Sequence, residues 1–177
     1  MDTSKMKTGL KQHAFCAVLG AVACMAWSSV SVADDKLAAG EVSGKAGKTA
    51  AVPITLKLGG DNVTFFGATF TVTPQGSAPA IAEKLTYEAA KGTPPPDLHT
   101  AVQAAAKLAI GYGATTISPP LTGTVRVGTL MVPLPPGASG TYQVGVVKVS
   151  AGDSSGKRLT ITGKAGKITV GKGAGSK

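Results

Sequence analysis

Val52-Pro53-Ile54-Thr55-Leu56-Lys57-Leu58 is the stretch that decides the fold of this 177-residue chain. Its apolar side chains recur at every second position, with Pro53, Thr55 and Lys57 between them. A period of two residues is typical of a strand that is buried on one face and solvated on the other. Because proline cannot donate a hydrogen bond to a neighbouring strand, Pro53 is expected at a sheet edge or at a β-bulge.

The same alternation recurs along most of the chain. In the stretch from Val63 to Thr73, the side chains of Phe66, Ala68, Phe70 and Val72 share one side. Further strands are expected at Ala80–Tyr87 (a weaker pattern), Gly123–Leu134, Thr141–Ser150, Leu159–Ile161 and Ile168–Val170. Turn-forming residues separate these stretches about every ten positions, which favours a β-sandwich of about eight or nine strands over a parallel sheet.

One expected strand changes phase within its length. Val125 and Val127 share one parity, whereas Leu130, Val132 and Leu134 share the other. A β-bulge inserts one residue and so lets both sets face inward. The sequence therefore predicts a bulge at Gly128.

A different pattern follows Asp97. Residues Leu98 to Ile110 are rich in alanine, a strong helix former, and Asp97 is a favourable N-cap residue. With Gly111 as the stop signal, this stretch predicts one short helix inserted between strands.

The first 33 residues have the order of an export signal. A lysine-containing start precedes an apolar run from Ala14 to Trp27, and Ser31-Val32-Ala33 suits signal peptidase cleavage after Ala33. The apolar run is shorter than the roughly 18 residues of a membrane-spanning helix. The alternative is lipidation at Cys24, since Ala21-Val22-Ala23-Cys24 resembles a bacterial lipobox. In either case we expect an exported protein, periplasmic or extracellular, without a transmembrane segment in its mature chain.

The mature chain is expected to be one domain at residues 34–170 with a flexible Gly/Lys tail at 171–177. It has fifteen basic and eight acidic residues, a net charge of +7, and no cysteine. Such a charge raises the idea of an anionic partner such as an acidic polysaccharide, lipid head groups or nucleic acid. Because the lysines are scattered through the sequence, we interpret them as a solvated surface and expect no nucleic-acid partner.

The mature chain offers little for catalysis or metal binding. Its acidic residues are spread out, and His99 has no second histidine or cysteine to share a metal. We therefore expect no catalytic residue, no metal site and no cofactor. Asp153-Ser154-Ser155-Gly156 has the composition of a hairpin turn and lacks the full ligand set of a calcium loop.

Aromatic residues decide whether a sugar platform is available. Phe66, Phe70 and Tyr142 fall in the inward phase and are expected in the core. Phe65, Tyr87 and Tyr112 are left as candidates to stack on sugar rings.

The order of several segments resembles a cohesin domain. An Ala-Gly turn and a Val-Pro-Ile strand open the pattern, and four later segments follow in the family's order. The segments are Glu41–Leu56, Phe66–Pro74, Gly128–Leu134, Gly140–Val144 and Gly166–Val170, within a resemblance that covers roughly residues 40–170.

The resemblance implies a nine-stranded jelly-roll sandwich without catalytic activity that binds a dockerin-like or other extracytoplasmic protein through one sheet face. It places the contact on the outward residues Thr69, Thr71, Gln143 and Val147. The alternative is a carbohydrate-binding module for cell-wall or matrix polysaccharide, and a third possibility is a self-associating structural protein of the envelope.

Overall fold

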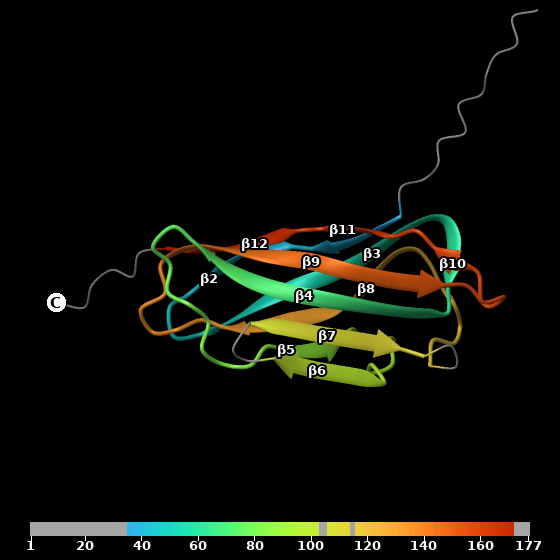
Figure 1. Cartoon of the computed structure of the whole chain (residues 1–177), viewed down its shortest axis with the longest axis horizontal. Coiled ribbons are helices and arrows are strands. Elements are labelled where there is room, and N and C mark those ends of the chain that lie inside the picture. The colour runs from blue at the N-terminus through green and yellow to red at the C-terminus, as the bar shows by residue number, and fades with distance from the viewer. Residues whose placement is uncertain (1–34, 103–105, 114–115, 172–177) are drawn as a thin grey trace, which may run out of the picture. The chain divides into compact units, whose positions relative to one another are not determined.

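The computed structural model describes residues 35–102, 106–113 and 116–171 (Figure 1). These residues form two β-sheets that pack face to face as a sandwich, and none of them is helical. The predicted signal peptide, Cys24 and residues 172–177 of the predicted tail lie outside the described residues. A helix of the length and apolarity needed to cross a bilayer is absent from the part of the chain that is described.

The first sheet, named here the β3–β8 sheet, has the strand order β11-β1-β3-β8-β5. β1 pairs antiparallel with β3 and parallel with β11, and the other pairs are antiparallel. The strands are β1 (Lys36–Ala39), β3 (Thr49–Val63), β5 (Thr86–Ala89), β8 (Leu121–Pro133) and β11 (Thr162–Lys164).

The second sheet, named the β4–β9 sheet, has the order β2-β12-β9-β4-β7-β6, with β10 paired to β9. In Figure 1 β9, β4, β7 and β6 lie toward the viewer. Its strands are β2 (Glu41–Gly44), β4 (Phe65–Gln75), β6 (Leu98–Val102), β7 (Lys107–Tyr112), β9 (Gly140–Gly152), β10 (Arg158–Leu159) and β12 (Gly166–Val170). The predicted all-β sandwich is confirmed, and its twelve described strands exceed the predicted eight or nine because β1, β2, β6, β7 and β11 were not among the expected strands.

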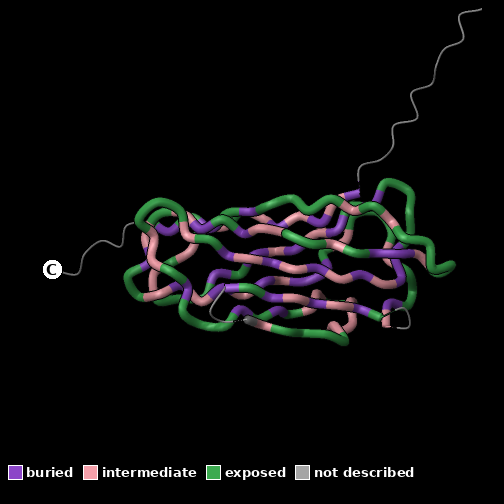
Figure 2. The backbone as a smooth tube through the Cα atoms, viewed as in Figure 1, coloured by how far each residue is buried: buried purple, intermediate pink, exposed green. Residues whose placement is uncertain are grey.

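The period-two patterns form the core between the sheets, where buried positions alternate with half-buried or exposed ones along most of β3 and β4 (Figure 2). Val52, Ile54 and Leu56 of β3 are fully buried, and Phe66 and Phe70 of β4 face them as predicted. Burying large apolar side chains from both layers is the main term that holds a disulfide-free sandwich together.

The predicted bulge lies where the sequence placed it. Ile54 pairs with Gly128 and Thr55 with Arg126, so Val127 is the additional residue in β8. Val127 and Gly128 are both buried, which keeps the two apolar sets inward. Pro53 lies in an interior strand, one residue from this register shift. The Pro53 carbonyl accepts a hydrogen bond from Gly40 N, the residue that follows β1. The ring nitrogen of Pro53, which carries no hydrogen, points to the same side of β3, where β1 has just ended.

The predicted helix from Leu98 to Ile110 is wrong. β6 and β7 pair as an antiparallel hairpin, and β7 continues the sheet beside β4. Leu108 and Ile110 alternate with exposed or half-buried neighbours and are buried opposite Phe70 and Ala68. Tertiary burial outweighs the local helix preference of alanine here, because propensity amounts to less than about 1 kcal/mol per residue. Asp97, the expected helix cap, instead accepts hydrogen bonds from Gly113 N and the Thr116 hydroxyl.

Candidate functional site

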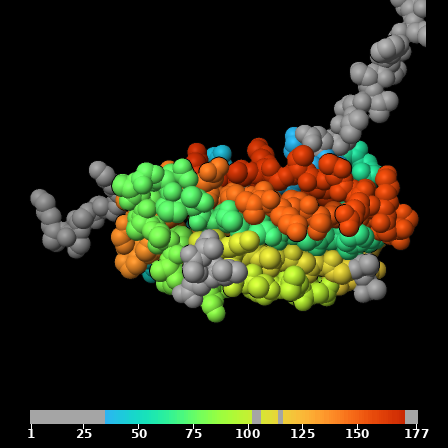
Figure 3. Space-filling view, viewed as in Figure 1, coloured from blue at the N-terminus to red at the C-terminus, as the bar shows by residue number. Residues whose placement is uncertain are grey.

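The outward face of the β4–β9 sheet carries a band of small, uncharged residues. We name this band the threonine face and define it as Thr69, Thr71 and Thr73 of β4 with Gln143, Gly145 and Val147 of β9. Figure 3 shows the side of the molecule on which β9, β4, β7 and β6 form one continuous surface. The residues that alternate with the threonine face along β4 and β9 point inward and pack in or against the core. This packing holds the backbone that carries the face.

Strand register brings the four predicted contact residues onto this one face. Thr71 pairs with Gly145 and Thr73 with Gln143, so the β4 and β9 residues lie directly side by side. Thr69 and Thr71 are half-buried, whereas Gln143 and Val147 are exposed. The short side chains leave the centre of the face without a deep cleft.

A bulge in β9, which the sequence did not predict, exposes Val147 on this face. Thr69 pairs with Lys148 and Phe70 with Val146, so Val147 is the additional residue in β9. Both Val147 and Lys148 point outward and are exposed. Val147 is 59% exposed and Leu98 is 54% exposed, the two large apolar side chains in the described residues that stand out in this way.

A shallow apolar hollow of about 340 Å³ lies beside Leu98. Gly67 of β4 pairs with Gly111 of β7, which pairs in turn with Leu98, so two neighbouring outward positions have no side chain. Phe65 at the start of β4, Ser150 of β9 and Asp97 also line the hollow. The hollow extends the face toward β6 with a surface that apolar side chains can contact.

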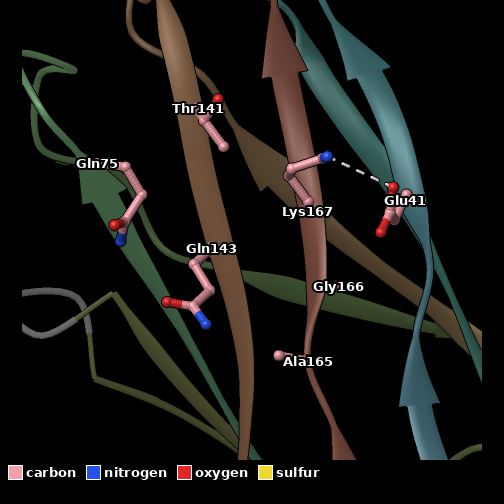
Figure 4. Close-up of a pocket in the computed structure, with 7 residues that line it drawn as sticks. All are labelled: Glu41, Gln75, Thr141, Gln143, Ala165, Gly166 and Lys167. Carbon is pink, nitrogen blue, oxygen red and sulfur yellow. Dashed lines mark ion pairs between the residues drawn. The ribbon is translucent and has the colours of Figure 1, made fainter.

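The opposite end of the face is polar. A depression of about 270 Å³ is lined by Gln75, Thr141, Gln143 and Lys167, among others (Figure 4). Lys167 Nζ lies 3.5 Å from the Glu41 carboxylate, and both side chains are exposed, so the pair contributes little to stability. Amide and hydroxyl groups in this depression can both donate and accept hydrogen bonds.

Two of the described acidic residues, Asp97 and Asp153, accept hydrogen bonds within turns. Hydrogen bonds from the Thr116 hydroxyl and Gly113 N hold the pKa of Asp97 below its usual value. Asp153 accepts hydrogen bonds from Ser155 and from Lys157 N, which lowers its pKa and confirms the predicted hairpin turn. His99 is exposed on β6. Among residues 35–102, 106–113 and 116–171, no three His, Cys, Asp or Glu side chains cluster in a way that could hold a metal ion.

Two of the three rings proposed as a sugar platform are in the interior. Tyr87 is 8% exposed and Tyr112 is 3% exposed, with their hydroxyl oxygens 3.5 Å apart. Tyr112 stacks on Phe66 at a centroid distance of 4.6 Å. Burial raises the pKa of both hydroxyls. The expectation that Tyr87 and Tyr112 could contact sugars is therefore wrong, because both belong to the inward phase of their strands, and Phe65 alone is half-buried at the surface.

Comparison with solved structures identifies the fold. The chain is similar to a cohesin of Clostridium acetobutylicum determined in solution, with a TM-score of 0.63, 21% identity, and coverage of 80% of this chain and 93% of that one. It is also similar to a chain of a type I cohesin–dockerin complex from Clostridium thermocellum, with a TM-score of 0.65, 13% identity and coverage of 77% and 99%. A non-cellulosomal cohesin of the hyperthermophilic archaeon Archaeoglobus fulgidus matches with a TM-score of 0.60, 12% identity and coverage of 78% and 91%.

No family model matches the sequence, and no curated protein matches it either. The likeness is therefore one of fold at low sequence identity. The predicted cohesin-like jelly-roll sandwich is confirmed as the fold.

Proposed function

We propose that this chain is a non-catalytic docking module whose threonine face binds a dockerin-type protein outside the cytoplasm. The observation that carries the proposal is the face itself: an uncharged band that contains exposed Val147, with Lys107, Lys148 and Lys167 at its borders and exposed Leu98 on β6, on a fold that cohesins share. Solved structures of this fold include cohesins in complex with dockerins.

The composition of the face suits protein docking. The centres of protein interfaces are depleted in charged residues and packed around a few apolar anchors. Val147 supplies such an anchor, since the bulge leaves its apolar side chain exposed. Thr69 and Thr71 supply short hydroxyls that allow close approach, and Gln143 supplies an amide at the polar end.

The alternative of an aromatic sugar platform is not favoured by the structure, because Tyr87 and Tyr112 face the core. Catalysis is not part of the proposal either, since the described carboxylates with lowered pKa are engaged in turns and His99 stands alone on an edge strand.

Export completes the proposal. Residues 1–33 serve as the signal peptide and are removed after Ala33, which leaves residues 34–170 as the docking domain and 171–177 as its tail. N-terminal sequencing of the exported protein tests this step: a first residue of Asp34 is expected, and a lipid-modified Cys24 would contradict it.

Calorimetric titration tests the docking function. The purified protein is titrated with dockerin modules from Clostridium thermocellum and Clostridium acetobutylicum and, as a control, with heat-unfolded dockerin. We expect at least one folded dockerin to bind with a dissociation constant of about 1 μM or tighter, equivalent to about −8 kcal/mol. Absence of binding to every dockerin, together with self-association in sedimentation, would instead support the structural envelope protein.

A further inference from the structure

We propose that the outward face of the β3–β8 sheet binds a linear acidic polysaccharide through a row of basic side chains. The row, named here the basic row, consists of Lys164 on β11, Lys36 on β1, Lys57 on β3 and Arg126 on β8. These four strands are consecutive neighbours across the sheet, and each contributes one basic side chain to the row. In the sequence the same residues are scattered over more than a hundred positions.

Strand register places the four residues close together. Lys36 is directly opposite Lys57. Lys164 and Arg126 occupy the next outward level of the same sheet, since Lys164 pairs with Ala38, Ala38 with Thr55, and Thr55 with Arg126. Neighbouring strands are about 4.8 Å apart, so the row crosses the sheet over roughly 14 Å. A small anion spans one or two of these charges, whereas a chain with a charge on each unit can meet all of them.

Three of the four side chains of the basic row are exposed on this face. Lys57, Arg126 and Lys164 are exposed, and none forms an ion pair with an acidic residue of the described chain. Asp35 is buried and accepts a hydrogen bond from Gly59 N, and the exposed Glu88 on β5 lies opposite Thr129, the residue to which Arg126 donates. An anionic chain that crosses the row can therefore approach these three side chains from solvent.

A hollow gives one end of the row a seat for a charged group. Arg126, Lys91, Thr124 and Thr129 line a cavity of about 620 Å³ between β8 and the chain after β5. Arg126 Nη2 donates a hydrogen bond of 2.9 Å to Thr129 Oγ1, which fixes the guanidinium toward this wall. A guanidinium with free N–H groups can grip a carboxylate through two parallel hydrogen bonds, and adjacent threonine hydroxyls can bond the ring hydroxyls of a sugar.

The surroundings of the row favour an acidic polysaccharide over other polyanions. Membrane binding by basic surfaces usually adds apolar side chains that enter the bilayer, yet Val147 and Leu98 are both on the opposite sheet. Binding of single-stranded nucleic acid uses aromatic rings on which bases stack. Of the aromatic residues in the described chain, Phe65 lies at the surface of the β4–β9 sheet and the other five are buried, so the basic row has no ring beside it.

The outward side of the β4–β9 sheet supplies matched controls. Lys107, Lys148 and Lys167 also point outward there, but they are separated by uncharged residues, and Lys167 pairs with Glu41. Removing two of these lysines changes the net charge as much as removing two residues of the basic row. A difference in polysaccharide binding between the two double variants therefore depends on where the basic residues lie and not on the total charge.

The test measures binding of the purified protein to polygalacturonate at low salt by affinity electrophoresis, with dextran as the neutral polymer. The wild type is expected to be retarded by polygalacturonate and not by dextran. The variant Lys57→Gln with Arg126→Gln is expected to bind at least tenfold more weakly, whereas Lys107→Gln with Lys148→Gln is expected to stay within about twofold of the wild type. Thermal melts of both variants check that each is folded.

Three results would overturn the proposal: no retardation of the wild type, equal loss in both double variants, or equal retardation by dextran. Parallel binding assays with vesicles containing phosphatidylglycerol and with oligodeoxythymidylate compare the other anion classes, and tighter binding to either one would replace the polysaccharide. Dockerin binding is measured on the same variants. Since the basic row lies on the opposite sheet from the threonine face, loss of polygalacturonate binding with dockerin binding intact separates this proposal from the docking function.

Discussion

The two central strand pairs, β3 with β8 and β4 with β9, each contain a one-residue β-bulge, and these two bulges point in opposite directions. At the first bulge two successive residues, Val127 and Gly128, both point into the core. At the second, two successive residues, Val147 and Lys148, both point into solvent. The same local irregularity therefore adds to the interior in one sheet and to the exterior in the other.

The difference shows how a bulge can serve packing or function. The inward bulge depends on glycine, since a Cβ at position 128 would lie 2.2 Å from Tyr87 Oη and 2.6 Å from the Glu88 carbonyl oxygen. It also sets the phase of the first half of β8, which points Arg126 outward beside the other basic residues. The outward bulge has no such packing constraint and exposes an apolar side chain on the threonine face.

The largest effect is expected from the core behind the outward bulge. Phe70 is fully buried and pairs with Val146 next to the bulge. Phe70→Ala should lower the free energy of unfolding by about 4 kcal/mol, because it removes a large apolar side chain and leaves a cavity. Thr73→Ala, an exposed position on the same strand, should change it by less than about 0.5 kcal/mol. Equal losses in urea denaturation would show that β4 does not alternate between core and surface.

A smaller effect separates the two bulges directly. Gly128→Ala should destabilise the protein by about 2 to 3 kcal/mol, since the new methyl group collides with the Tyr87 ring and with backbone. Val147→Ala should stay within about 0.5 kcal/mol of the wild type. If denaturant melts showed the reverse order, the assignment of inward and outward bulges would be exchanged.

Alkaline titration tests whether both sheets bury their tyrosines. Burial raises the pKa of Tyr87, Tyr112 and Tyr142, which are the three tyrosines of the chain. The unfolded chain releases these protons near pH 10 and the folded chain holds them, so the free energy of unfolding is unaffected below pH 10 and falls above it. Phenolate absorbance at 295 nm should therefore rise only with loss of β-sheet circular dichroism. A tyrosine that titrates near pH 10 in the folded protein would place that ring at the surface.

The smallest effect concerns the β6–β7 hairpin. Ala106 has a φ of 41°, a left-handed conformation that costs an L-residue about 1 to 2 kcal/mol. Ala106→Gly should therefore leave the protein equally stable or more stable by about 0.5 kcal/mol. In the helix that the sequence predicted, the same change would cost about 1 kcal/mol, so a thermal melt distinguishes the two structures.

The contrast between the two bulges also explains what sequence reasoning could reach. The inward bulge was predicted because the apolar residues of this strand change parity at Gly128. Val147 was predicted to face outward from the alternation of Tyr142, Val144 and Val146. The bulge at Val147 was not predicted, because two successive outward residues do not visibly interrupt the alternation of apolar residues in the sequence.

Two other features depend on information that local patterns do not carry. The alternation of Leu108, Ile110 and Tyr112 was visible, but the alanines before it indicated a helix, and only the neighbouring strand β4 decides between the two. The basic row requires the register of β1, β3, β8 and β11, which joins residues from opposite ends of the chain. Scattered lysines were therefore read as a solvated surface.

The most direct test of the threonine face compares one added lysine on each sheet. Val147→Lys places a charge on the exposed outward bulge, and Ala51→Lys places the same charge on an exposed, outward position of β3. In calorimetric titrations with the dockerin that binds the wild type, Val147→Lys should weaken binding at least tenfold, about 1.4 kcal/mol, and Ala51→Lys should leave it unchanged. Unchanged binding by Val147→Lys, or an equal loss in Ala51→Lys, would contradict docking through the threonine face.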